Sequence, residues 1–197
     1  MCGVLLAAGA GRRMGGPKAL LRYRGELLVE RGVSMLHEGG CSPVVVVLGA
    51  GAGEAPTLPH AVAVINQDWA SGMASSLRVG LGAAQGAAAV VALVDQPSIT
   101  ADAVRRLIAA LRPGGAAVAT YGGRPRNPVV LDAHLWPEVA AAATGDTGAR
   151  SWLRAHPELV TAVPCDDVAD PADLDSPADL DSLANLDSPD APSPQRQ

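Results

Sequence analysis

The stretch that most constrains this chain is residues 3–18, where an apolar segment ends abruptly in a glycine-rich loop. Glycine has no Cβ, so the backbone N–H groups of such a loop can approach an anion closely. The loop also carries Arg12, Arg13 and Lys18, and Lys18 is the only lysine in the chain. Arginine and lysine supply mobile positive charge at the same place. We therefore expect a strand that leads into a phosphate-binding loop, with a nucleoside triphosphate as the favoured ligand.

A plain tight turn is the alternative interpretation of this loop, because the chain contains 22 glycines and such loops arise easily. The spacing also differs from two common phosphate-binding motifs. Met14 stands where the motif G-x-G-x-x-G has its third glycine, and Ala19 follows Lys18 where the P-loop has Ser or Thr. The residues alone favour phosphate binding over a structural turn, and they leave both open.

The composition indicates one globular domain. The chain has 197 residues, 48% of them hydrophobic and only 3% aromatic, so we expect a core of Ala, Val and Leu. It contains no apolar run long enough to span a membrane, and its first residues lack the basic segment of a signal peptide, so we expect a cytoplasmic protein. The odd number of cysteines and the absence of a C-x-x-C pair predict free thiols rather than disulfides or a zinc site.

Charge divides the chain into two unequal parts. Residues 1–163 hold 14 Lys or Arg and 11 Asp or Glu, a net charge of +3, whereas residues 164–197 hold nine Asp and one Arg, a net charge of −8. The mildly basic body suits small anionic substrates, and it lacks the clustered basic face with interleaved aromatics that nucleic-acid binding needs. A six-residue repeat fills residues 173–190. We predict a domain over residues 1–184 and a low-complexity, disordered tail over 185–197.

Strand and helix patterns alternate along the chain. We expect strands at 3–8, 43–48, 61–65, 87–94, 116–121, 128–131 and 159–163. We expect helices at 26–38, 74–84, 101–111, 132–143 and 149–156. This alternation predicts a single Rossmann-like α/β domain with a mostly parallel twisted sheet and helices on both faces.

Asp95 directly follows the apolar segment 87–94. Ligands of such sheets bind outside the carboxyl ends of the strands, so we expect Asp95 and the glycine-rich loop at one edge. Mg²⁺ is usually held by one or two carboxylates together with substrate phosphates. A turn cap before Pro97 is the alternative role for Asp95, and the neighbouring loop makes metal binding the preferred one.

Several sequence strings resemble one protein family. The string LAAGAGRRMGGPKALL (residues 6–21) is similar to the signature of MobA-like NTP transferases, whose fold is that of the nucleotide-diphospho-sugar transferases. Four more strings match in order, NQDWASGMASSLRVGL (66–81), LVDQPSIT (93–100), RNPVVL (126–131) and TGDTGARSWLRAHP (144–157). DLDSPADL (173–180) is similar to the closing motif of the family. The chain looks most like the molybdenum cofactor cytidylyltransferase branch.

The resemblance implies an enzyme that transfers a nucleoside monophosphate from a nucleoside triphosphate to a phosphorylated acceptor and releases pyrophosphate. It implies Arg13, Lys18 and Asp95 as catalytic residues and Mg²⁺ as the cofactor, held by Asp95 and Asp175. Asp181 lies in a near-copy of the Asp175 motif and is an alternative second ligand. The nucleotide-binding residues implied are Leu6, Ala7, Ala8, Gly9, Ala10, Gly11, Arg13, Lys18, Gly72, Met73 and Ser75.

Smaller differences favour CTP as the donor and a molybdopterin-type acceptor. Guanylyltransferase relatives tend to read LAGG and place Asp before the lysine, whereas this chain has Ala8 and Pro17. Ala8 would narrow the space beside the base and favour a pyrimidine. The product would reach a molybdoenzyme or its maturation factor through a transient contact. A guanylyl- or other nucleotidyltransferase, and a non-catalytic cofactor chaperone, remain the alternatives.

Two other residues of these motifs, Trp69 and Asp146, have two interpretations each. Trp69 borders a ligand or anchors a loop on the core. Asp146 pairs with Arg150 to stabilise its turn, or contacts the acceptor. Asn127 stands where relatives often have His.

Overall fold

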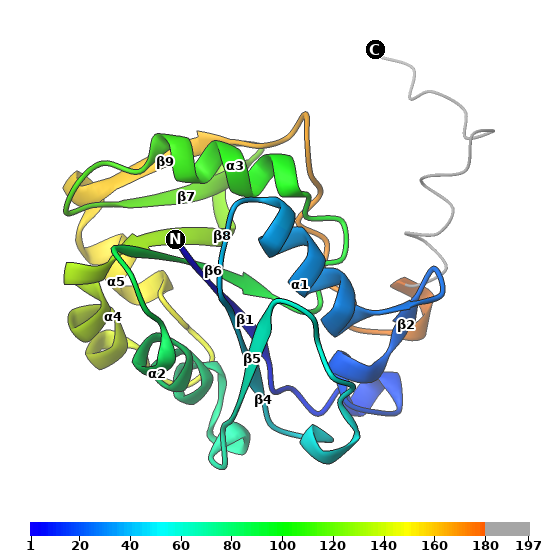
Figure 1. The fold of residues 1–197 in the computed structure, drawn as a ribbon. Helices are drawn as coiled ribbons and strands as arrows, with labels where there is room; N and C mark the ends of the chain where they lie inside the picture. Colours follow the sequence, from blue (N-terminus) through cyan, green and yellow to red (C-terminus); the bar gives the residue numbers. More distant parts are fainter. Residues whose placement is uncertain (180–197) are drawn as a thin grey trace.

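The computed structural model describes residues 1–179, and its centre is a seven-stranded sheet (Figure 1). The strand order is β5-β4-β1-β6-β8-β7-β9. The strands are β1 (Cys2–Ala7), β4 (Val44–Leu48), β5 (Ala61–Ile65), β6 (Ala88–Leu93), β7 (Ala116–Tyr121), β8 (Arg124–Asp132) and β9 (Val160–Pro164). β8 runs antiparallel to β6 and β7, and the other strands share one direction. The expected single α/β domain with a mostly parallel sheet is confirmed; the expected tail and Asp181 lie outside the described residues.

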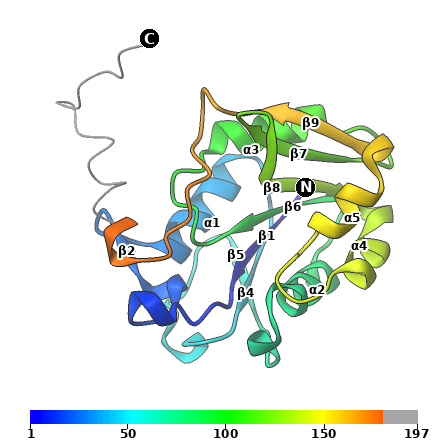
Figure 2. The same cartoon turned by 180° about the vertical axis from the view of Figure 1, so that it is seen from behind.

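Helices cover both faces of this sheet, as Figures 1 and 2 show. α1 (Leu28–Glu38) and α3 (Ala101–Ala110) pack on one face. α2 (Met73–Ala83), α4 (Trp136–Ala142) and α5 (Arg150–Ala155) pack on the other. Successive β1 side chains alternate between the two apolar clusters, Leu5 facing α1 and Leu6 facing α2. Because both faces are buried, the central strands are continuous apolar runs.

Two helix glycines set how closely α1 and α2 approach β1. A Cβ at Gly80 of α2 would lie 2.5 Å from Cγ1 of Val4, and a Cβ at Gly32 of α1 would lie 2.7 Å from Cδ2 of Leu5. The two helices therefore press on neighbouring residues of the same strand from opposite faces. This close packing fixes the position of β1, whose carboxyl end leads into the glycine-rich loop.

Some element boundaries differ from the prediction. The helix expected from residue 26 begins at Leu28, because Glu26–Leu27 forms strand β3, paired in a hairpin with β2 (Arg22–Tyr23). β8 begins at Arg124 rather than at residue 128, because it turns directly back from Tyr121 and pairs with β7. Its first residues are exposed, so their apolar pattern is weak. The helix expected over 132–143 is split into a 3₁₀ turn (Ala133–Leu135) and α4.

The segment after β9 returns to the carboxyl end of β6. It passes α3, where the hydroxyl of Thr100 donates to the carbonyl of Val168, and ends near β2 (Figures 1 and 2). Leu174 is fully buried in the core, and its N–H donates to the carbonyl of Asp95 at 2.8 Å. These contacts of Leu174 place its neighbour Asp175 beside Asp95, although the two aspartates are 80 positions apart in the sequence.

The cysteines of the described region, Cys2, Cys41 and Cys165, are free thiols, as expected, and all three are buried. His37 and His60 stack with their ring centroids 3.9 Å apart, a contact that their sequence spacing did not predict. Among residues 1–179, no helix is long and apolar enough to cross a membrane.

Candidate active site

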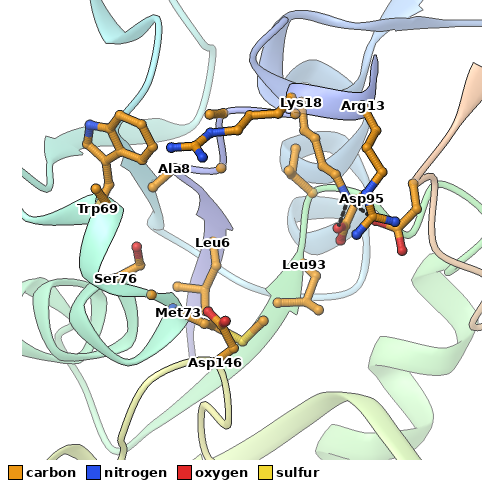
Figure 3. Close-up of a pocket in the computed structure, with 18 residues that line it drawn as sticks. Leu6, Ala8, Arg13, Lys18, Trp69, Met73, Ser76, Leu93, Asp95 and Asp146 are labelled. Carbon is orange, nitrogen blue, oxygen red and sulfur yellow. Dashed lines mark hydrogen bonds and ion pairs between the residues drawn. The ribbon is translucent and has the colours of Figure 1, made fainter. Parts of the chain in front are cut away.

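A cavity of about 550 Å³ opens at the carboxyl ends of β1 and β6 (Figure 3). Most of the predicted site residues line it together: Leu6, Ala8, Gly9, Ala10, Gly11, Arg13, Lys18, Gly72, Met73, Asp95 and Asp175. Ala7 and Ser75 do not line it. Ala7 points into the core on the α1 side of β1, because side chains alternate along a strand. The cavity is within the size range of sites for small-molecule ligands, roughly 300–1,000 Å³.

The glycine-rich loop forms one wall of this cavity. Gly11 has φ = 54°, in the left-handed region, and a Cβ there would overlap the carbonyl oxygen of Gly16. The loop closes on itself through the N–H of Lys18, which donates to the carbonyl of Gly9 at 3.2 Å. In the described part of the chain, the N–H groups of Gly9 and Ala10 have no protein acceptor. Such N–H groups beside mobile cations form a suitable anion site.

The ammonium of Lys18 lies between two carboxylates. Its Nζ atom is 2.6 Å from Oδ2 of Asp95 and 2.7 Å from Oδ1 of Asp175. The Lys18 and Asp95 side chains are only 15% and 20% exposed, so solvent screens this pair weakly. Burial by itself lowers the pKa of Lys18, but Asp95 and Asp175 outweigh it and raise the pKa above its usual value. Lys18 therefore remains an ammonium at neutral pH.

A third carboxylate, Asp173, lies close to this cluster. Burial and the charges of Asp95 and Asp175 raise the pKa of Asp173, although its Oδ1 accepts a hydrogen bond of 2.9 Å from Nε2 of Gln96. We did not predict a site role for either residue. The side-chain oxygen of Gln96, Oε1, is buried without a partner among residues 1–179.

The carboxylate oxygens of Asp95 and Asp175 fit a divalent cation that is bound together with a substrate. Asp95 and Asp175 already converge on one cationic group, Lys18, so their oxygens face a common position. Within the described region, no cluster of three or more His, Cys, Asp or Glu can hold a metal by itself. Two carboxylates plus phosphate oxygens is the usual arrangement for Mg²⁺.

The opposite end of the cavity is formed by Ala8, Trp69 and Ser76 (Figure 3). Nδ2 of Asn66 donates to the hydroxyl oxygens of both Ser75 and Ser76, at 2.8 and 3.0 Å. The hydroxyl of Ser75 donates in turn to backbone carbonyls of residues 68 and 72, so its proton is already engaged. The Ser76 hydroxyl has no acceptor in the described part of the chain and faces the cavity. Ser76 is thus the serine available to a ligand.

The loop of residues 144–148 docks onto the start of α2. Gly72 has φ = 114°, and a Cβ there would lie 2.7 Å from the carbonyl oxygen of Gly145. The N–H of Ala74 donates to that same oxygen at 2.8 Å, and Oδ1 of Asp146 accepts from the N–H of Met73 at 3.1 Å. The ion pairs found among residues 1–179 do not include one between Asp146 and Arg150; Asp146 instead holds its loop on the first residue of α2, Met73.

Sequence reasoning missed part of the lining. Ala70, Ser76, Leu93 and Val94 also line the cavity, and none was named as a ligand-binding residue. Arg12 was expected only as one of the cations of the phosphate-binding loop, and it lines the cavity too. Leu93 and Val94 directly precede Asp95, so the strand-end argument could have included them. Nothing in the sequence spacing indicated Ala70.

A mostly parallel sheet with a glycine-rich loop after its first strand and a carboxylate after a neighbouring strand is the arrangement of a nucleotide-binding α/β domain. The family described as the MobA-like NTP transferase domain matches residues 3–160. The chain belongs to this family of nucleotidyltransferases, which bind a nucleoside triphosphate and a small-molecule acceptor. The recognition of the family from its motifs is confirmed.

Two curated relatives carry different functional names. The chain is 46% identical over 186 residues to nicotine blue oxidoreductase of Paenarthrobacter nicotinovorans, covering 88% of this chain and 91% of that protein. It is 34% identical over 169 residues to a probable molybdenum cofactor guanylyltransferase of Opitutus terrae, covering 83% of this chain and 79% of that protein.

Solved structures share the fold over almost the whole chain. Rv0371c from Mycobacterium tuberculosis H37Rv superimposes with a TM-score of 0.81 at 27% identity, covering 92% of this chain and 96% of that one. A complex of the same protein with manganese superimposes with a TM-score of 0.75 at 25% identity and the same coverage.

Proposed function

We propose that this protein transfers CMP from CTP to the phosphate of a molybdopterin-type molybdenum cofactor and releases pyrophosphate. The observation that carries the proposal is the Lys18 ammonium, held between Asp95 and Asp175 at the edge of a cavity walled by the glycine-rich loop. Positive charge and free N–H groups gather where a triphosphate would lie, and carboxylates gather beside them. Hydrolysis through a protein nucleophile would need a different set of groups.

The chain's residues would act mainly by positioning and charge stabilisation. The N–H groups of Gly9 and Ala10 would bind the triphosphate, and Arg13 and Lys18 would neutralise the negative charge that develops on the leaving pyrophosphate. The acceptor phosphate oxygen would attack the α-phosphorus in line, forming one P–O bond while the bond to the β-phosphate breaks. No covalent intermediate with the protein is required.

Asp95 and Asp175 would hold the divalent cation, with Mg²⁺ as the expected ion. When bound, the cation supplies charge neutralisation for the triphosphate. The Lys18 ammonium would then leave the two carboxylates and turn to the phosphates, a movement that its flexible side chain permits.

The base end of the cavity supports a pyrimidine. Ala8 and Trp69 both line this end of the cavity. The Ala8 methyl takes up space that a glycine at position 8 would leave to the base. The Ser76 hydroxyl is available to donate to a base carbonyl or ring nitrogen.

Calorimetric titration with CTP, GTP and ATP in the presence of Mg²⁺ tests the donor. We expect CTP to bind at least tenfold more tightly than either purine nucleotide. A preference for GTP would reject the cytidylyl assignment and favour a guanylyltransferase. Pyrophosphate release with CTP and purified molybdenum cofactor then tests the acceptor.

A second candidate function follows from the 46% identity to nicotine blue oxidoreductase over 88% of the chain. The N–H groups and cations of the glycine-rich loop would suit the diphosphate of a dinucleotide as well as a triphosphate. In this alternative, a hydride from the reduced nicotinamide and a proton from water would convert nicotine blue to its two-electron-reduced form. The loss of visible nicotine blue absorbance with NADH or NADPH, without CTP, would favour it. An unchanged absorbance would reject it.

A further inference from the structure

A second, smaller cavity of about 150 Å³ lies beside the first, bounded by β8, the loop of residues 147–149 and α5. Met73 lines both cavities. The same docked loop serves both, because Asp146 lines the larger cavity while Thr147 and Gly148 line the smaller one. The two cavities are therefore neighbours, separated by a flexible methionine side chain that packs against Gly148.

Three arginines, Arg126, Arg150 and Arg154, line the smaller cavity, and none of its lining residues is Asp or Glu. Their side chains make no ion pair or hydrogen bond with any residue of the described region. Other arginines are engaged, as Arg106 is by both carboxylate oxygens of Asp167. All three arginines are exposed, so an anion that entered the cavity could pair with guanidinium groups that have no partner among residues 1–179.

The rest of the lining is apolar. Val118, Val129 and Leu153 contribute branched side chains, and Asn127 and Thr147 add neutral hydrogen-bonding groups. An inorganic anion alone would gain nothing from the apolar part. The lining favours an anionic group attached to an apolar or flat ring system, because arginine guanidinium groups both pair with anions and stack on planar surfaces.

The size of the cavity indicates which part of a ligand it can take. About 150 Å³ is smaller than the roughly 300–1,000 Å³ typical of a complete small-molecule site. The cavity is large enough for one end of a ligand whose remainder passes Met73 into the larger cavity. That remainder would reach the cavity in which Lys18 and Asp95 lie.

We propose that Arg126, Arg150 and Arg154 bind the end of the acceptor substrate that is remote from its reacting phosphate, and that this end is anionic and attached to a flat ring. The assignment rests on the proposed function, in which the acceptor phosphate must reach Lys18 while the rest of the molecule lies elsewhere. A molybdopterin-type acceptor, with an anionic metal–dithiolene group on a pterin ring, has this chemistry.

A binding experiment tests the cavity without turnover. The probe is 2-naphthyl phosphate, an aromatic anion, titrated by fluorescence into protein saturated with CTP and Mg²⁺ so that the larger cavity is filled. We expect saturable binding to the wild type and at least tenfold weaker binding to the double variant Arg150→Gln, Arg154→Gln. Arg112→Gln is the matched control, since Arg112 is exposed and lies outside both cavities. Circular dichroism would establish that all variants fold.

Two results would overturn the inference: a wild type that shows no saturable binding of the probe, or a double variant that binds it as the wild type does. Neither depends on the reaction. If CMP transfer is absent while probe binding behaves as expected, the proposed function fails and the anion site stands. If transfer occurs, the double variant should raise the KM for the acceptor at least tenfold and leave the KM for CTP within twofold. An unchanged acceptor KM would reject the assignment.

Discussion

The Nζ atom of Lys18 lies 2.6 Å from Oδ2 of Asp95, so a loop that follows β1 and the carboxyl end of β6 meet in one ion pair. The same ammonium also holds Asp175, 2.7 Å away on the segment that follows β9. One cation thus occupies the position on which two carboxylates converge. Nucleotide and metal binding should therefore be linked through the position of a single side chain.

Replacement of Lys18 should separate metal binding from turnover. In Lys18→Met, Asp95 and Asp175 no longer have a competing cation. We therefore expect Mn²⁺ to bind more tightly in the absence of nucleotide, by about tenfold, or roughly 1.4 kcal/mol. Nucleotidyl transfer should fall at least 100-fold because the pyrophosphate loses its ammonium. Electron paramagnetic resonance of free Mn²⁺ measures the first effect. A variant that binds Mn²⁺ less tightly than the wild type would contradict this coupling.

Asp95→Asn should remove metal binding and turnover while the fold is kept. The amide can still occupy the site but carries no charge, so we expect Mn²⁺ affinity and kcat each to fall at least 100-fold. Asp102→Asn is the control, since Asp102 forms an exposed pair with Arg105 on α3, away from the cavity. Activity of Asp95→Asn at the level of this control would argue against the metal assignment.

The two neighbouring serines should respond differently to the same change. Ser76→Ala should raise the KM for the nucleotide several-fold, because its hydroxyl faces the cavity. It should destabilise the fold less than Ser75→Ala, because it removes one hydrogen bond, from Nδ2 of Asn66, whereas Ser75 makes three. Ser75→Ala removes the bonds to the carbonyls of residues 68 and 72, so it should lower the free energy of unfolding by about 1 kcal/mol. Steady-state kinetics and thermal unfolding of both variants measure the contrast. A larger effect on KM from Ser75→Ala, with a larger effect on stability from Ser76→Ala, would contradict the roles assigned to the two hydroxyls.

Two glycines of α2 offer a packing test. Gly80→Ala places a methyl 2.5 Å from Val4 Cγ1 and should destabilise the protein by about 1–3 kcal/mol through overpacking. Gly82 has no atom within 4 Å of its Cβ position, so Gly82→Ala should stabilise by about 0.5–1 kcal/mol. Urea unfolding compares the pair. Equal stabilities would mean that α2 can move away from β1 without cost.

Asp132 should make stability depend on pH. Hydrogen bonds from the N–H of Gly114 and from His134 lower the pKa of Asp132 below its usual value. A carboxylate with a lowered pKa in the folded state contributes stability above its unfolded pKa, about 4, and loses it as the pH falls through the folded value. Asp132→Asn should thus lower the unfolding temperature at pH 7, with a difference that shrinks below pH 4. Glu158→Gln, an exposed carboxylate change, should show no such trend.

Much of the fold was predictable, because central strands buried on both faces leave unbroken apolar runs such as Val44–Leu48. The rule that ligands bind outside the carboxyl ends of the strands then placed Lys18 and Asp95 at the same edge of the sheet, where the structure has them. The first residues of β8 were missed, since Arg124 to Arg126 are exposed and carry no apolar signal. They pair only because the chain turns back on β7 there, which is a tertiary effect.

The details of the site were less accessible from sequence. Ala7 and Ser75 were predicted as ligand-binding residues because they lie in the same motifs as residues that do line the cavity. The alternation of side chains along β1 turns Ala7 away from the cavity and Ala8 toward it. The hydrogen bonds around Asn66 engage the Ser75 hydroxyl and leave that of Ser76 available. Asp173 reaches the Lys18 cluster from the segment after β9, and Arg126 of β8 reaches Arg150 and Arg154 of α5 only through the tertiary fold. No local pattern records that proximity.

The buried position of Leu174 has a consequence for how this protein folds during its synthesis. Its N–H bond to Asp95 and its place in the core put the last part of the cleft more than 170 residues from the first methionine. During synthesis, the strands from β1 to β6 would emerge from the ribosome before the segment around Leu174 that packs beside Asp95. A nascent chain, or one clipped by a carboxypeptidase before residue 173, would hold the phosphate loop but not the finished cleft.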